Sequence, residues 1–292
     1  MGSFAGVVNV NKEKGYTSFD VVAILRRLYD VKAGHTGTLD PNATGVLPIC
    51  LGKATKFSET FMGGTKRYTA EVVLGVTTST GDMTGEVVTR QAKDVSLPGK
   101  QKITAAVMSF MGKQEQVPPM YSAIKVGGKK LYDLARAGKT IHRKARPVEI
   151  YEIEAFSFGE GSFKINVCCS KGTYIRSLCS DIGEMLGCGA TMGDLVRTRS
   201  GPFCIEDALT VGEIKEKSDI RSLVVPLGEL LPYPTAQIDP ACAKNAKNGN
   251  PVKLSNLVSY DTESKKHWLK NKDEVIGLFR LEPGLLKCEV LL

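Results

Sequence analysis

Residues 34–45 read GHTGTLDPNATG, a run with three glycines, one proline and a single acidic residue, Asp40. Closely spaced glycines and a proline predict a loop, and the missing side chains let a ligand approach the backbone. An aspartate before proline in such a loop most often serves as a turn residue. Pro41 biases Asp40 towards an extended backbone. A carboxyl with a pKa of about 3.9 is ionised at neutral pH and can act as a nucleophile or base. From the loop alone, the turn and the chemical role both stay open.

Around this loop, the spacing of hydrophobic residues predicts a mixture of helices and strands. Three helices are expected, over residues 20–28, 103–111 and 175–186. Ser18 or Thr17 can cap the first of them. Three runs rich in β-forming residues predict strands, at residues 68–74, 148–158 and 163–169. The sequence therefore predicts an α+β fold with a mixed or antiparallel central sheet and flanking helices.

The chain length of 292 residues suggests about two domains. The segment LLPYP at residues 230–234 is typical of a linker. Short β-type runs follow it at residues 275–281 and 285–291. We expect a main domain over residues 1–230 and a small β-rich domain over residues 231–292.

The positive charge is concentrated in one segment. Residues 112–146 hold nine basic and only two acidic residues, and so carry nearly the whole net charge of +8. Tyrosines, glycines and prolines lie among these charges. Such a loop-rich segment suits contact with a phosphate backbone, but a solvated lysine-rich surface explains the charge equally well.

Several classes of chemistry lack their usual motifs. Neither a dinucleotide-binding nor an ATP-binding glycine motif occurs, and no serine nucleophile elbow is present. Without a C-x-x-C pair and with only three histidines, a metal cluster is not expected. We expect no cofactor, and interpret the eight cysteines as mostly buried thiols of a cytoplasmic protein. No apolar run reaches the roughly 20 residues of a membrane span, and the N-terminal residues do not resemble a signal peptide.

The longer run GHTGTLDPNATGVLPICLGKATKF, residues 34–57, resembles the signature of the TruB family of tRNA pseudouridine-55 synthases. Four further stretches resemble the family in the same order: VNVNKEKGYTSFDVV, KRYTAEVVLG, PPMYSAIKVGGKKLYDLARAG and SKGTYIRSLCSDIGEMLGCGA. The resemblance covers residues 5–205 strongly. It implies the pseudouridine synthase fold, followed by a small C-terminal domain of the RNA-binding PUA type.

The resemblance also implies roles for individual residues. Asp40 is expected to be the catalytic aspartate, Arg176 its ion-pair partner and Tyr174 a participant in proton removal. Tyr174 and Arg176 are two residues apart, so they converge only if the helix after Gly172 has an irregular start. Tyr68 is expected to stack on the target uracil and His35 to fill the space of the flipped nucleotide. The remaining expected substrate and RNA contacts are Asp82, Leu195, Lys12, Lys125, Lys129, Lys130 and Arg143.

These roles imply one function, the isomerisation of uridine to pseudouridine at position 55 in the T-arm loop of tRNA. The expected partner is the tRNA T stem-loop, bound by a cytoplasmic monomer without a guide RNA. Two alternatives stay open: a tRNA-folding chaperone that needs no catalysis, and a guide-RNA-dependent relative. The basic segment at residues 112–146, expected to grip the T arm, favours the stand-alone enzyme.

Overall fold

A computed structural model describes residues 5–92 and 96–292 of the chain. Within these residues, eleven strands form one mixed sheet whose main path runs β14-β1-β3-β12-β4-β11-β10-β7. In that order the strands are Leu209–Thr210, Ala5–Lys12, Thr44–Gly52, Ala190–Ser200, Lys66–Leu74, Ser162–Cys169, Arg146–Phe156 and Gly112–Gln116. Most neighbours are antiparallel, but β12 pairs with β3 in parallel, and so does β1 with β14. The predicted fold class is confirmed.

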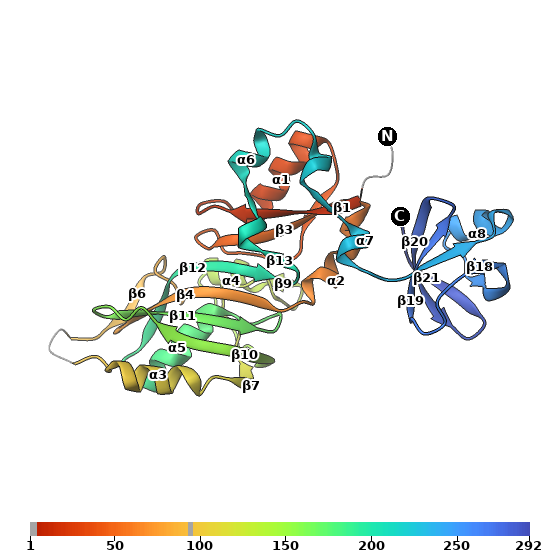
Figure 1. The fold of residues 1–292 in the computed structure, drawn as a ribbon. Coiled ribbons are helices and arrows are strands. Elements are labelled where there is room, and N and C mark those ends of the chain that lie inside the picture. The colour runs from red at the N-terminus through yellow and green to blue at the C-terminus, as the bar shows by residue number, and fades with distance from the viewer. Residues whose placement is uncertain (1–4, 93–95) are drawn as a thin grey trace.

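Two groups of helices cover this twisted sheet (Figure 1). The helices α1 (Ser18–Tyr29) and α6 (Val211–Lys215) lie at the end that contains β1 and β3. The helices α3 (Lys100–Met108) and α5 (Ile175–Leu186) lie along β4, β11 and β10. The buried residues of α1, α3 and α5 share one hydrophobic core with the apolar faces of these strands.

The predicted elements are found with shifted ends. The helix α1 begins at Ser18, where Thr17 and Asp20 form a reciprocal capping box. The helix α3 was predicted over residues 103–111 but spans Lys100–Met108, since Gly99 is its N-cap and Phe110 and Met111 lie beyond its end. The segment 34–45 was predicted as a loop throughout. Its two ends are instead strands, because β2 (Ala33–His35) pairs with β3, which begins at Thr44.

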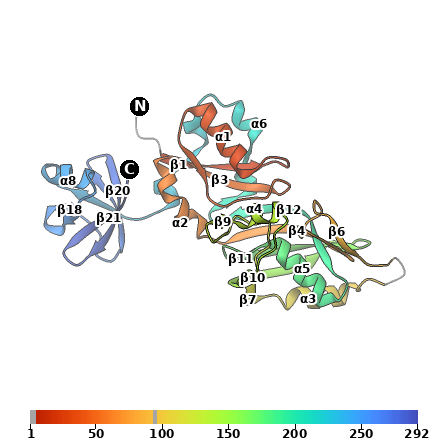
Figure 2. The same cartoon turned by 180° about the vertical axis from the view of Figure 1, so that it is seen from behind.

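The C-terminal part of the chain forms a second sheet of six strands within the described residues, as predicted. These are β16 (Thr235–Ile238), β17 (Val252–Lys253), β18 (Leu257–Ser259), β19 (Lys266–Asn271), β20 (Glu274–Glu282) and β21 (Leu285–Leu291). Figure 2 shows this sheet as a separate body beyond α2 (Ser58–Met62). Trp268 joins the two bodies: its ring lies 5.7 Å from that of Phe57, and its indole N–H donates to the Leu231 carbonyl at 2.8 Å.

The eight cysteines are all free in the described structure, but only half of them are fully buried. Cys188, Cys204, Cys242 and Cys288 are partly exposed, so the prediction of mostly buried thiols was too strong. No helix among the described residues is both long enough and apolar enough to cross a membrane.

The contact between α5 and β12 leaves no room for a side chain at Gly183. A Cβ atom there would collide with the backbone nitrogen of Ala190, which cannot move aside. We expect Gly183→Ala to lower the free energy of unfolding by about 1–3 kcal/mol, the usual cost of overpacking. Gly228→Ala is the control, since a Cβ at Gly228 meets nothing within 4 Å. Equal urea-unfolding free energies for the two variants would contradict this packing.

Candidate active site

Asp40 lies in the loop between β2 and β3, and the neighbouring α1 holds that loop in place. The Ser18 hydroxyl donates to the Leu39 carbonyl at 3.0 Å and accepts from the Leu39 N–H at 2.8 Å. The Ala43 N–H donates to the Asp40 carbonyl at 3.1 Å. The backbone on both sides of the carboxyl is therefore fixed, while the side chain itself remains 39% exposed.

Arg176 is the centre of the site. Its guanidinium lies 3.0 Å from the Asp40 carboxylate and 3.8 Å from that of Asp82. It also donates to the carbonyls of Thr80 at 3.1 Å and Tyr121 at 2.7 Å. Arg176 is only 6% exposed. Its two carboxylate and two carbonyl partners therefore hold the guanidinium in a single orientation. The structure thus brings together three residues that the sequence analysis selected, from three distant parts of the chain.

The two carboxyls bound by Arg176 have pKa values that move in opposite directions. Burial raises the pKa of Asp40, and the nearby Arg176 charge offsets this only in part. Burial also acts on Asp82, but hydrogen bonds from Thr84 and Thr80 outweigh it and lower the pKa of Asp82. Asp82 therefore stays charged and helps to raise the pKa of Asp40. Divergent pKa values in a carboxyl pair are typical of sites that transfer protons.

Tyr174 precedes α5 and is not helical, with φ −99° and ψ 111°. Tyr174 therefore lies outside the helix, so the helical spacing that would separate it from Arg176 does not apply. The side-chain amide of Gln116 fixes the position, since it accepts from the Tyr174 N–H at 2.8 Å and donates to the Tyr174 carbonyl at 3.1 Å. Burial raises the pKa of the Tyr174 phenol.

Three further predicted residues come from β2 and from the neighbouring strands β4 and β12. Tyr68 on β4 lies opposite Arg197 of β12, and Leu195 lies opposite Ala70. Leu195 is buried, while Tyr68 and His35 are half-buried. Burial lowers the pKa of His35, whose Nδ1 accepts from the Gly37 N–H at 3.4 Å. Neutral His35 can make this contact beside the Asp40 loop.

Lys12, predicted to contact RNA, faces no open surface in this structure. Its side chain is fully buried, and its ammonium donates to the carbonyls of Glu13, Tyr16 and Pro41. The Pro41 bond ties β1 to the residue that follows Asp40. Burial lowers the pKa of Lys12 to about 8.

The predicted RNA-binding lysines lie on a hairpin of β8 (Lys125–Val126) and β9 (Lys129–Lys130). Its turn is Gly127–Gly128, both with positive φ, as a two-residue hairpin requires. Lys125 and Lys129 are exposed, and Lys130 donates to the Tyr132 hydroxyl at 3.0 Å. Arg143 is half-buried and donates to the Pro118 carbonyl at 3.0 Å, so part of its role lies in holding the basic segment together.

Sequence analysis missed several residues that shape the site. Thr80 and Thr84 hold Asp82 from two residues on either side, a spacing typical of local side-chain turns that was available as a signal. Gln116 and Arg197 act across the sheet, at positions that no local pattern marks.

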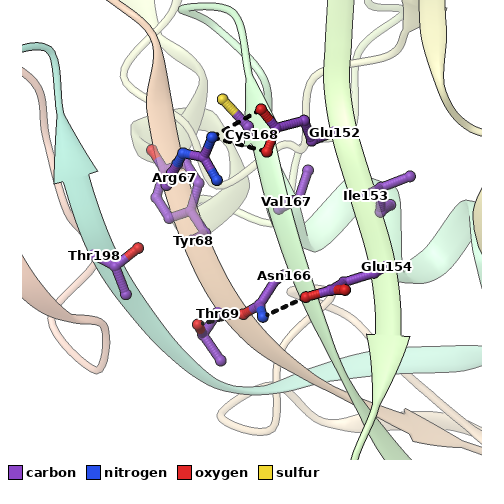
Figure 3. A pocket seen from close by; sticks show the side chains of 10 residues that line it. All are labelled: Arg67, Tyr68, Thr69, Glu152, Ile153, Glu154, Asn166, Val167, Cys168 and Thr198. Carbon is purple, nitrogen blue, oxygen red and sulfur yellow. Dashed lines mark hydrogen bonds and ion pairs between the residues drawn. The ribbon is translucent and has the colours of Figure 1, made fainter.

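A cavity of about 410 Å³ lies on the opposite face of the same sheet (Figure 3). Side chains alternate along β4, so Arg67 and Thr69 point away from the face that carries Tyr68. In the cavity Arg67 pairs with Glu152 at 2.8 Å, and Asn166 links Thr69 to Glu154. These groups satisfy one another. Tyr68 also lines the cavity, but Asp40, Asp82 and Arg176 do not. Among the described residues no group of three potential metal ligands occurs.

The site pairs an aspartate of the β2–β3 loop with an arginine of α5. Comparison with known proteins defines the chain as a pseudouridine synthase. The chain belongs to the TruB family of these enzymes. The family model described as "TruB family pseudouridylate synthase (N terminal domain)" matches residues 26–175. The model described as "tRNA pseudouridylate synthase B C-terminal domain" matches residues 176–232.

Individual relatives are similar in sequence to this protein over most of its length. A protein named tRNA pseudouridine synthase B from Clostridium perfringens is 42% identical over 291 residues, covering 98% of this chain and 98% of the relative. One of the same name from Alkaliphilus oremlandii is 46% identical over 255 residues, 87% of this chain and 84% of the relative. A solved structure described as a Cbf5-Nop10-Gar1 complex aligns with TM-score 0.72 and 26% identity, over 98% of this chain and 84% of the matched chain.

Replacing Arg176 tests the electrostatics of the site. In Arg176→Met, burial of Asp40 is no longer offset, so the pKa of Asp40 rises further and the acidic limb of the pH–rate profile moves to higher pH. We expect the rate at pH 7 to fall about 100-fold or more, as on removal of one preorganised charged donor. Single-turnover pseudouridine formation between pH 5 and 9 measures both effects. Arg67→Met, which removes an exposed ion pair, is the control; an unmoved acidic limb in Arg176→Met would contradict the pairing.

Proposed function

We propose that this enzyme converts uridine to pseudouridine at position 55 in the T-arm loop of tRNA, with Asp40 as the nucleophile. The observation that carries the proposal is the Asp40–Arg176 pair at 3.0 Å, with a carboxylate that is still partly exposed to an incoming base. The relatives named tRNA pseudouridine synthase B support tRNA as the substrate.

The target uracil must leave the folded RNA loop before Asp40 can reach it. Flipping a nucleotide costs a few kcal/mol, and stacking on an aromatic ring returns about 1–3 kcal/mol. Tyr68 supplies that ring, while Leu195 and His35 bound the space beside it. Phosphate contacts from the basic segment contribute the remaining binding free energy.

Asp40 then attacks, either at C6 of the base or at C1′ of the ribose. Both routes break the N-glycosidic bond, let the uracil rotate in place, and rejoin it to the ribose through C5. The bond that Asp40 formed is broken in the process, which regenerates the free carboxylate. No redox step or nucleotide hydrolysis is required.

The proton on C5 must finally be removed. The pKa of Asp40 is raised, so its carboxylate is a stronger base than an exposed aspartate. The pKa of the Tyr174 phenol is raised above its ordinary value of about 10, so Tyr174 keeps its proton at neutral pH. We therefore favour Asp40 as the general base that takes up the C5 proton, with the protonated Tyr174 phenol in contact with the uracil.

The basic segment and the C-terminal domain are proposed to bind the tRNA. The segment 112–146 reaches the catalytic centre through Tyr121, whose carbonyl accepts from Arg176, so its grip on RNA and the site are physically connected. Residues 231–292 form the proposed PUA-like RNA-binding domain. The proposed enzyme works as a cytoplasmic monomer and needs no guide RNA, since its own basic hairpin supplies the phosphate contacts.

The Asp40→Asn variant separates catalysis from binding. The amide keeps the size of the side chain but is not a nucleophile, so we expect turnover to be abolished while the Kd for tRNA stays within about threefold of the wild type. Single-turnover assays and filter binding with a tRNA transcript measure the two quantities. Asp194→Asn, at an exposed carboxylate paired with Lys14, should keep full activity. Product formation by Asp40→Asn at the wild-type rate would exclude Asp40 as the nucleophile. Growth rescue by an inactive Asp40→Asn would favour a tRNA-folding role.

The exposed lysines of the hairpin should govern affinity and its dependence on salt. We expect Lys125→Ala with Lys129→Ala to weaken tRNA binding and to reduce the slope of log K against log salt by about one for each phosphate that is no longer bound. The rate at saturating enzyme should stay the same. Lys215→Ala with Lys217→Ala, two exposed lysines near α6, is the control. A slope equal to that of the wild type would remove the hairpin from the RNA interface.

A further inference from the structure

Arg197 is the largest fully buried side chain in the described structure and is 2% exposed. No carboxylate lies within ion-pair distance of its guanidinium among the described residues. A buried cation without such a partner is strongly unfavourable unless other groups satisfy its hydrogen bonds. At Arg197 these groups are three backbone carbonyls: Val46 at 2.7 Å, Gly37 at 3.0 Å and Thr38 at 3.4 Å.

The three carbonyls lie on both sides of Asp40. Gly37 and Thr38 precede it and Val46 follows it, so one guanidinium joins the two ends of the catalytic loop. Such a planar group with donors in a fixed geometry can bind several acceptors at once, which a lysine ammonium does less well.

The backbone of Arg197 closes the same loop. Residue 197 on β12 pairs with Gly45 of β3, and a Cβ atom at Gly45 would collide with the Arg197 carbonyl oxygen. Gly45 also has φ +101°, a conformation that residues with a side chain rarely adopt. The C-terminal end of the Asp40 loop, at Gly45, therefore packs directly against the main chain of Arg197.

On its other side Arg197 meets Tyr68. The two residues are directly opposite each other in the pairing of β12 with β4. Burial raises the pKa of the Tyr68 phenol, and the Arg197 guanidinium partly opposes that shift, so the two side chains interact. Arg197 is in contact with the loop that carries Asp40 and with the ring expected to carry the uracil.

We propose that Arg197 is a positioning residue that sets the spacing between Asp40 and Tyr68, and so aligns the flipped base with the carboxylate. This rests on the proposed function, in which Asp40 attacks a uracil stacked on Tyr68. Arg197 does not touch the reacting atoms. Its effect passes through the carbonyls of the loop, and a displacement of about 1 Å in such a site can cost about 100-fold in rate.

Arg197→Met and Arg197→Lys test this role. Methionine keeps an unbranched apolar stem but removes all donors. Lysine keeps the positive charge but lacks the planar arrangement of donors. We expect the single-turnover rate at saturating enzyme to fall about 100-fold in Arg197→Met and about 10-fold in Arg197→Lys, with the Kd for tRNA within about threefold of wild type. The control is Arg199→Met, on the same strand but exposed, which should keep the wild-type rate.

A purely structural role would lower stability without changing the rate of the folded molecules. Urea unfolding therefore gives the folded fraction, and each rate is expressed per folded protein. The proposal would be overturned if Arg197→Lys and the folded fraction of Arg197→Met both react within about threefold of the wild-type rate. If Asp40→Asn is inactive and both Arg197 variants are normal, only this inference fails. If Asp40→Asn retains activity, the proposed function fails and the inference fails with it.

Discussion

The ion pair between Asp40 and Arg176 is the interaction on which the rest of the site depends. Asp40 comes from the β2–β3 loop, and Arg176 comes from the first turn of α5, more than 130 residues later. The same guanidinium binds the Tyr121 carbonyl of the basic segment and the Thr80 carbonyl beside Asp82. One buried arginine thus joins the Asp40 loop, a second carboxylate and the basic segment. The mixed sheet is the frame that brings these distant parts of the chain to one place.

A second constraint is the balance between burial and charge. Burial raises the pKa of Asp40, and the Arg176 charge opposes that effect without cancelling it. Asp82 stays charged because the hydroxyls of Thr80 and Thr84 donate hydrogen bonds to its carboxylate and lower its pKa. In the proposed mechanism, the raised pKa makes the Asp40 carboxylate a stronger base for the late proton transfer, while the adjacent Arg176 cation favours the ionised form needed for attack.

Much of this arrangement was predictable from the sequence. The Asp40 loop, the helix after Gly172 and its irregular start were expected, because glycine, proline and hydrophobic spacing act locally. The exact span of α3 was not, since the apolar spacing continues past the end of the helix while capping decides where it stops. Lys12 was expected to contact RNA from the family resemblance, but its three carbonyl partners come from tertiary structure. Arg197 was missed because its partners lie more than 150 residues away in the chain.

The central claim is that this chain alone places pseudouridine in the T arm of tRNA. Mapping pseudouridine in an unmodified tRNA transcript, after incubation with the purified protein and nothing else, tests it most directly. We expect a single new pseudouridine at position 55, formed without guide RNA or added cofactor. No pseudouridine in the transcript, or product only after a guide RNA is supplied, would contradict it.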